Sequence, residues 1–494
     1  MEIVKIKGLP PLFFRPLFTG WLLALISSWA IPSARLAAAG PTNAWPLRLA
    51  AFCDDKEREE QLLSKKLATP LPSEVAAFFQ SARRADCPAL TNILEHFRVS
   101  IPRRLKSGQA DWSFFWPPLE EVAAACRIYH RSGAKYPAAF GDDISRSIPP
   151  GSIYFGSSEA GRMLVTALNP TVVEGKPFTV FAANNFIDGW YAGYLKAIND
   201  GTIRLPTVKE TTDVFSKYTE EYSADYNKHP DPDWTPPLGL PAPGVDASAD
   251  PQQVYYEMVA GQKVGDSVNA RLVKWMVDHN PGKGFYYEQG SSLLLMFQPY
   301  HVSPSQIFLF PYLSPHDFIF KLNHDSVLEL SAKDLDANHE FWSKQVGLRL
   351  GNWLRSDTRV TDVCAFVEAV DLRKDLTAFQ GDRDFLTNDF APPAYSRLRL
   401  AQADLYHWRL QRTPQAAPAA RLKAEADFAF RQAYALNPAG HEILSDYMRF
   451  LLEQRRLDDA ILVLSTSLKL LPPDDREKQT CQQLLQQLEQ ADSK

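Results

Sequence analysis

The feature that most restricts the fold is a strand, a glycine-containing turn and a helix that follow one another in the middle of the chain. Residues 152–168 run from a short strand (SIYF) through a turn bounded by Gly156 and Gly161 into a helix. Residues 178–199 repeat the order of strand and helix. Recurring alternation of this kind predicts an α/β domain over residues 148–330, built on an open, mostly parallel sheet with helices on its faces.

Further elements of this domain are less regular. A helix is expected at residues 267–279, and strands are expected at residues 284–288, 307–310 and 318–322. Residues 230–251 contain seven prolines, which is too many for a helix or a central strand. This segment therefore predicts a surface excursion that can act as a flap.

Helical patterns flank the α/β domain on both sides. Apolar residues at helical spacing predict a small helical subdomain over residues 40–147 and a helical region over residues 331–494. In the second region two segments align at an offset of 34, which pairs Ala426 with Ala460. That period is typical of tetratricopeptide repeats. Because stacked repeats need about three units to be stable alone, we expect the pair to cap the helical region.

Residues 1–39 have the order of a signal peptide. Basic residues precede the uncharged run 21–32, and small residues end near Ala39. The run is shorter than the roughly 20 residues that a membrane-spanning helix needs. We therefore expect cleavage near Ala39, an exported chain in the periplasm or outside the cell, and no membrane span in the mature chain. An uncleaved anchor is the alternative.

Charge and cysteine content argue against a nucleic-acid-binding protein and against a zinc protein. Lys and Arg number 53 against 58 Asp and Glu, a net charge of -5 that lacks the positive surplus needed to bind nucleic acid. The five cysteines lack the Cys-x-x-Cys spacing of a zinc site, so neither a metal nor another cofactor is expected. In an oxidising compartment, one interpretation bridges Cys53 to Cys87, and the other leaves isolated buried thiols.

The candidate site lies where the first two strands end, at the carboxyl edge at which open α/β sheets bind ligands. The amides after Gly156 can hold an anion or Glu159 at the helix N-terminus, although no nucleotide-binding motif is present. The alternative is structural, with a serine capping the helix and Arg162 paired with a carboxylate. The ligand-binding candidates are Gly156, Ser157, Ser158, Glu159, Arg162, Asn184, Asp188 and Tyr191.

These residues resemble the soluble C-terminal region of bacterial protein O-mannosyltransferase-like membrane proteins. The resemblance rests on the strand 153–155 with its turn, on residues 184–191 and on the strand 285–288. It implies an exported α/β region followed by tetratricopeptide repeats. It implies architecture more than activity, since glycosyl transfer in that family belongs to a membrane-embedded half that this sequence lacks.

The stretch Trp116–Arg409 is also similar to exported proteins of Verrucomicrobia-type bacteria. There the turn usually reads Gly-Thr-Asp-Pro-Gly-Arg. This chain has Ser158, Glu159 and Ala160 in place of Thr-Asp-Pro, and it keeps the following Gly161 and Arg162. A role that requires the shorter aspartate is therefore not expected here.

Two functions follow from these observations. The first is a non-catalytic binding or scaffold protein of envelope or glycan-related machinery. Its helical repeats would dock a protein or peptide partner, and a sugar or nucleotide sugar is a candidate ligand. The alternative is a glycosyltransferase or hydrolase with Glu159 or Asp188 as base and Arg162 as anion clamp. A buried carboxylate of raised pKa beside Gly156 would favour the enzyme, and an open pocket at the candidate residues would favour ligand binding. A helix cap and an ion pair there would favour a third alternative, a purely structural envelope protein.

Overall fold

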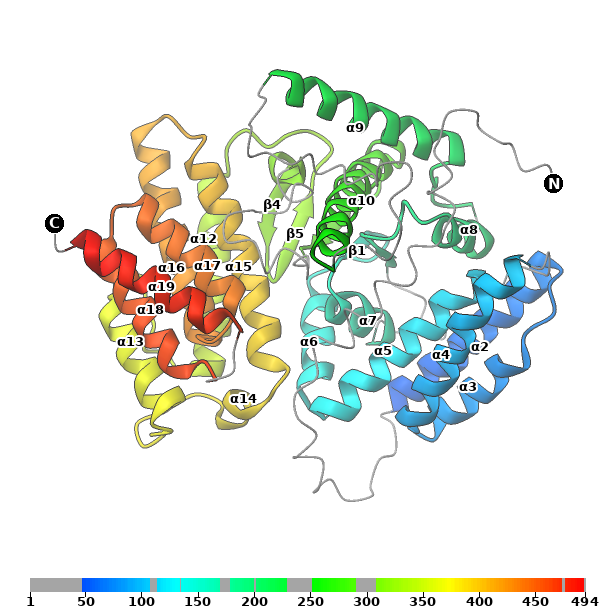
Figure 1. Cartoon of the computed structure of the whole chain (residues 1–494), viewed down its shortest axis with the longest axis horizontal. Coiled ribbons are helices and arrows are strands. Elements are labelled where there is room, and N and C mark those ends of the chain that lie inside the picture. Colours follow the sequence, from blue (N-terminus) through cyan, green and yellow to red (C-terminus); the bar gives the residue numbers. More distant parts are fainter. Residues whose placement is uncertain are drawn as a thin grey trace.

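A computed structural model shows a mainly helical molecule around one small sheet (Figure 1). The N-terminal helices and the C-terminal helices lie on opposite sides of the sheet. The predicted signal peptide and residues 230–250 of the predicted excursion lie outside the described residues. The structure describes residues 47–106, 113–133, 135–168, 178–199, 201–228, 251–289, 308–472 and 476–492.

The sheet has the strand order β2-β1-β3-β5-β4 and is mixed. Its strands are β1 (Ile153–Gly156), β2 (Thr179–Ala182), β3 (Phe285–Glu288), β4 (Leu313–His316) and β5 (Ile319–Leu322). Both neighbours of β1 are parallel to it, whereas β5 is antiparallel to β3 and to β4. The predicted α/β composition is therefore found, but the prediction of a mostly parallel sheet holds for only three of the five strands.

Two errors of the sequence analysis lie in the antiparallel half of the sheet. The expected strand at residues 307–310 is wrong, because Phe308 and Leu309 are helical and η5 (Phe310–Tyr312) is a 3₁₀ turn that contains Pro311. Strand β4 was missed. It is joined to β5 by Asp317 and Phe318, a two-residue turn without the glycine that normally marks a hairpin.

The helices between the strands place the candidate site. They are α7 (Glu159–Leu168), α8 (Gly189–Ile198), α9 (Val208–Lys228) and α10 (Pro251–His279). Helix α7 leads from β1 to β2 on one side, and the chain then crosses to β3 on the other side of β1. The carboxyl ends of β1 and β3 therefore form a topological switch point, where open α/β sheets bind ligands. Both strands are buried at every position, as strands covered on both faces are.

The N-terminal helices share a core with the sheet. They are α2 (Leu47–Leu67), α3 (Ser73–Arg83), α4 (Cys87–Lys106), α5 (Trp116–Ser132) and α6 (Lys135–Arg146), with η3 (Ser113–Phe115) before α5. Helices α5 and α6 pack on α7, and α2 packs on α7 and α8. The buried apolar residues of both regions form one continuous cluster.

The buried thiol that lies beside Cys87 is not that of Cys53, which the sequence analysis considered as its bridge partner. Cys87, at the start of α4, has its Sγ 2.7 Å from the Sγ of Cys126 on α5. Both thiols are buried. The sulfur neighbour of Cys87 in space is therefore Cys126 rather than Cys53.

The C-terminal region consists of successive helices. They are α12 (Ala332–Leu350), α13 (Val360–Val367), η6 (Glu368–Leu372), α14 (Arg383–Thr387), α15 (Ala391–Leu410), α16 (Ala416–Leu436), α17 (His441–Glu453), α18 (Leu457–Leu470) and α19 (Arg476–Asp492). Helix α15 packs on α16, and α17 packs on α18. Ala426 and Ala460, which the 34-residue offset relates, are both 0 % exposed. Among the helices described, none has the length and apolar character to span a membrane.

Candidate functional site

The N-terminus of α7 holds a carboxylate, and that carboxylate belongs to Glu288 at the end of β3. Glu288 pairs in register with Gly156, so its side chain starts beside the turn. The backbone N–H groups of Ser157 and Ser158 both donate to its Oε2 at 3.0 Å, and the Ser158 hydroxyl donates to Oε1. The anion expected at this turn is thus supplied by a strand 131 residues away in the sequence.

Burial and hydrogen bonding act in opposite directions on Glu288. The residue is 2 % exposed, and this desolvation raises its pKa above the ordinary glutamate value. The hydrogen bonds from Ser158 and Ser157 favour the ionised form and reduce the rise. The turn therefore contains a buried carboxylate of raised pKa, the feature that would favour an enzyme.

Both glycines of the turn allow close approach. A Cβ atom on Gly161 would collide with the carboxyl group of Glu288, and one on Gly156 would lie 2.9 Å from the Cα of Arg162. The Gly161 N–H donates to the Ser158 Oγ at 2.8 Å, so this serine satisfies one amide of the first helical turn. The glycine turn is thus explained by packing within the chain.

Arg162 is paired within the chain. Its Nη2 donates to Glu120 Oε2 on α5 at 3.2 Å. With the Asn185 amide oriented so that its oxygen faces the guanidinium, that oxygen accepts from Arg162 Nη1 at 3.1 Å. The proposed anion clamp therefore already holds a carboxylate from the N-terminal helices.

Asp188 lies near this ion pair. It precedes α8 as its N-cap residue, but its side chain makes no capping hydrogen bond. Burial raises its pKa to about 7, and the negative charge of Glu120 adds to the rise. A carboxyl group that titrates near neutral pH can accept or donate a proton at that pH.

The other two predicted residues hold the loop after β2. The backbone carbonyl of Asn184 accepts a hydrogen bond at 2.6 Å from Asn269 on α10. The buried hydroxyl of Tyr191 accepts a hydrogen bond at 2.8 Å from the N–H of Ala182, the last residue of β2. Their contacts fix the edge of the sheet.

The structure brings Arg162 and Asp188 together around Glu120, whereas Ser157 and Ser158 bind Glu288. Of Glu159, only its place at the start of α7 is described. Sequence reasoning missed Glu120, Asn185 and Glu288 as parts of the site. A glutamate at the end of a buried strand was a readable signal for Glu288, but its partner could not be read from spacing.

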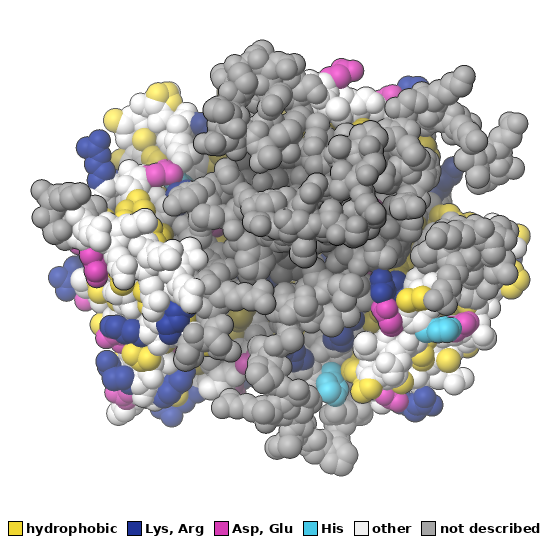
Figure 2. Space-filling model, in the orientation of Figure 1, with side chains coloured by type: hydrophobic (Ala, Val, Ile, Leu, Met, Phe, Trp, Pro, Cys, Tyr) yellow, Lys and Arg dark blue, Asp and Glu magenta, His cyan; other side chains and the backbone are white. Residues whose placement is uncertain are grey.

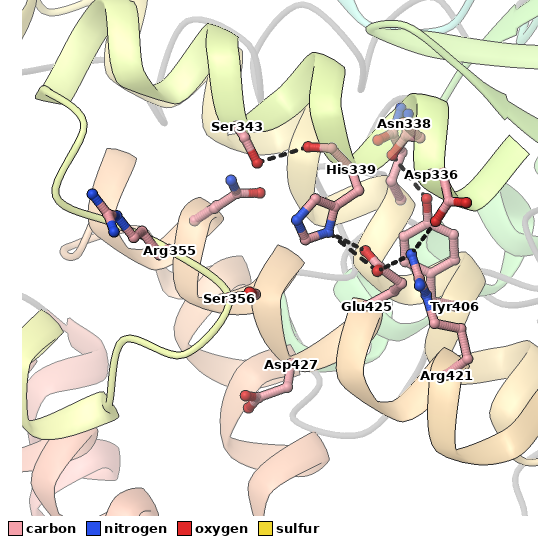
Figure 3. Close-up of polar contacts among 12 residues, drawn as sticks. Asp336, Asn338, His339, Ser343, Arg355, Ser356, Tyr406, Arg421, Glu425 and Asp427 are labelled. Atoms are coloured by element: carbon pink, nitrogen blue, oxygen red, sulfur yellow. Dashed lines mark hydrogen bonds and ion pairs between the residues drawn. The ribbon is translucent and has the colours of Figure 1, made fainter. Parts of the chain in front are cut away.

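A second polar cluster links α12 to α16 (Figure 3). The His339 Nδ1 lies 3.0 Å from the Glu425 carboxylate, which Arg421 also contacts at 2.9 Å. The Ser343 hydroxyl donates to the backbone carbonyl of His339 rather than to its ring. Because a nucleophilic serine needs a hydrogen bond to its base, this cluster does not form a hydrolytic Ser-His pair.

Comparisons with protein-family models, with curated proteins and with solved structures found no match. The family resemblance inferred from the sequence therefore stays a prediction. Within the described ranges, no group of three or more His, Cys, Asp or Glu side chains is placed to hold a metal ion.

Proposed function

We propose that this chain is an exported, non-catalytic binding or scaffold protein of envelope or glycan-related machinery. The observation that carries the proposal is the occupation of the α7 N-terminus by Glu288. An anionic substrate at this position would have to displace a buried carboxylate and its hydrogen bonds, which costs free energy. The pairing of Arg162 with Glu120 supports the same interpretation.

Partner docking is assigned to the C-terminal helices. The packed pairs α15–α16 and α17–α18, together with the sequence period of 34, support a tetratricopeptide-like arrangement, whose usual ligand is a peptide or a partner helix. Charged side chains of both signs are interspersed on the described part of the face in Figure 2. This mixture suits a protein or peptide partner better than a polyanion.

The alternative is a glycosyltransferase-like or hydrolytic enzyme. It is favoured by the two carboxyl groups of raised pKa, Glu288 and Asp188, at the carboxyl edge of the sheet. Asp188 is the better candidate base of the two, because no side-chain hydrogen bond holds it to the cap of its helix.

A single assay separates the two functions. The purified protein is incubated with a panel of nucleotide sugars and glycosides, and product is followed by mass spectrometry beside the Asp188→Asn variant. The proposal expects no turnover by either protein. Turnover by the wild type that the Asp188→Asn variant loses, while the variant unfolds at a temperature no lower than that of the wild type, would establish the enzyme instead.

The proposed export can be tested through the redox state of two buried thiols. In an oxidising compartment, the thiols of Cys87 and Cys126 should give two protons and two electrons to a disulfide oxidant and form one bond. A hydrogen bond from Cys126 lowers the pKa of Cys87 and so favours the attacking thiolate. Non-reducing digestion of protein isolated from its native compartment should yield the linked peptide, whereas free thiols in that material would contradict export.

A further inference from the structure

A pocket of about 470 Å³ lies between α6, the β4–β5 turn and helices α12, α14 and α15. Its volume falls within the range of about 300–1,000 Å³ that small-molecule sites have. Because β5 runs antiparallel to β3, with Phe320 opposite Tyr287, the β4–β5 turn lies at the edge where β3 ends. The pocket thus belongs to the antiparallel half of the carboxyl edge, and none of the eight predicted site residues lines it.

Most charged side chains of this pocket are paired within the chain. Asp143 accepts hydrogen bonds from Tyr395 at 2.7 Å and from Arg349 at 2.9 Å. Asp382 accepts from the Tyr136 hydroxyl at 2.8 Å and also caps α14. The paired charges of the pocket are Lys135, Asp143, Arg146, Arg349 and Asp382.

Two charged side chains that line the pocket have no ion-pair partner among the described residues. The carboxylate of Asp317 and the ammonium of Lys344 form no ion pair with each other or with any other described residue. They have opposite signs. A ligand that neutralises both must carry a positive and a negative group of its own.

The backbone at Asp317 provides a second, independent observation. Its φ is +49°, a left-handed conformation that favours glycine, in the first position of a two-residue hairpin turn. Its carbonyl accepts hydrogen bonds from Gln402 at 2.8 Å, Trp342 at 3.1 Å and Asn338 at 3.3 Å, so α12 and α15 hold the turn in place. An unpaired acidic side chain kept where glycine would be unstrained points to a use for its carboxylate.

We propose that this pocket binds a zwitterionic α-amino acid with an apolar side chain. The ammonium group of the ligand pairs with Asp317 and its carboxylate pairs with Lys344. The apolar body contacts Phe341 and Leu348, which line the same pocket, and Leu348 is 62 % exposed without such a ligand. The inference is independent of the scaffold function proposed above, since it uses neither the repeats nor Glu288.

Calorimetric titration of the whole protein with L-phenylalanine and with L-leucine tests the proposal. Two compounds remove one charge each: N-acetyl-L-phenylalanine lacks the ammonium, and L-phenylalaninamide lacks the carboxylate. We expect L-phenylalanine to bind at least about tenfold more tightly than either compound, because each lacks one charge-assisted contact. Absence of binding by both amino acids at 10 mM ligand, or equal affinity for all three phenylalanine compounds, would overturn the proposal.

The variants assign each charge. The Asp317→Gly variant keeps the turn and should reduce the affinity for L-phenylalanine to that for the N-acetyl compound. The Lys344→Met variant should reduce it to that for the amide. Lys333→Met, on the exposed surface of α12 and outside the pocket, is the matched control and should bind as the wild type does. Unchanged affinity in Asp317→Gly, with its unfolding temperature at or above that of the wild type, would refute the assignment.

Discussion

The two halves of the sheet end differently at the same edge. In the parallel half, Glu288 satisfies the amides of the glycine turn and Glu120 neutralises Arg162. In the antiparallel half, Asp317 and Lys344 line a pocket, and their charged groups form no ion pair with a described residue. The part of the edge with the strongest sequence signal for binding is therefore filled by the chain itself. The part with unused charges carries no sequence motif.

Removing the internal anion should have the largest effect. Glu288→Ala leaves the N–H groups of Ser157 and Ser158 without their acceptor, and we expect the free energy of unfolding to fall by about 3 kcal/mol. Urea denaturation measures the loss, and Glu489→Gln on the exposed face of α19 is the control. An unchanged stability would remove the contrast between the two halves.

The strands of the parallel half and their helices were readable from the sequence for a simple reason. Each of these strands is a short apolar run of consecutive residues, and β1, β2 and β3 were all placed within one or two residues of their bounds. The occupant of the turn was not readable, because Glu288 approaches from 131 residues away. The partner of Arg162 lies on a helix of the other predicted subdomain, which spacing along the chain cannot place.

The antiparallel half was harder for a different physical reason. A hairpin is normally recognised by glycine or asparagine at the turn, and here Asp317 takes the left-handed conformation instead. Three side chains from distant helices hold that conformation, so tertiary contacts and not local propensity determine the turn. The pocket there forms because α6 packs on α15, and no local sequence pattern predicts that contact.

The second prediction concerns pH and the parallel half. The pKa of Asp188 is about 7 in the folded state and near 3.8 in the unfolded chain, so the folded state holds the extra proton between these values. Stability due to this group is therefore lost as the pH rises from about 4 to 7. Relative to the wild type, Asp188→Asn should gain stability steadily as the pH rises through this range, and it should gain almost nothing near pH 4.

Chemical denaturation at several pH values tests this dependence. Asp325→Asn, at an exposed position, should show no such trend and is the matched control. A stability difference between Asp188→Asn and the wild type that does not change with pH would mean that the pKa of Asp188 is not raised by folding. The enzyme alternative would then lose the raised pKa that favours Asp188 as its base.

The third prediction measures the strain in the antiparallel half. Replacing Asp317 by glycine relieves a positive φ in a non-glycine residue, and we expect the free energy of unfolding to rise by about 1 kcal/mol. Lys374 has a φ of +56° and lies outside the pocket, so Lys374→Gly should bring a similar gain. If Asp317→Gly instead destabilises the protein, its carboxylate has a structural role and the pocket proposal loses its second observation.

The smallest effect should come from the unpaired cation, and it sharpens the comparison most directly. Lys344→Met removes a charge without a partner, so stability should change by less than about 0.5 kcal/mol. Arg162→Met removes a cation of the same sign that Glu120 neutralises, and it should cost about 2 kcal/mol because it breaks a largely buried ion pair. Equal losses in the two variants would show that Lys344 also has a partner within the folded chain, and its pairing with a ligand would then have no basis.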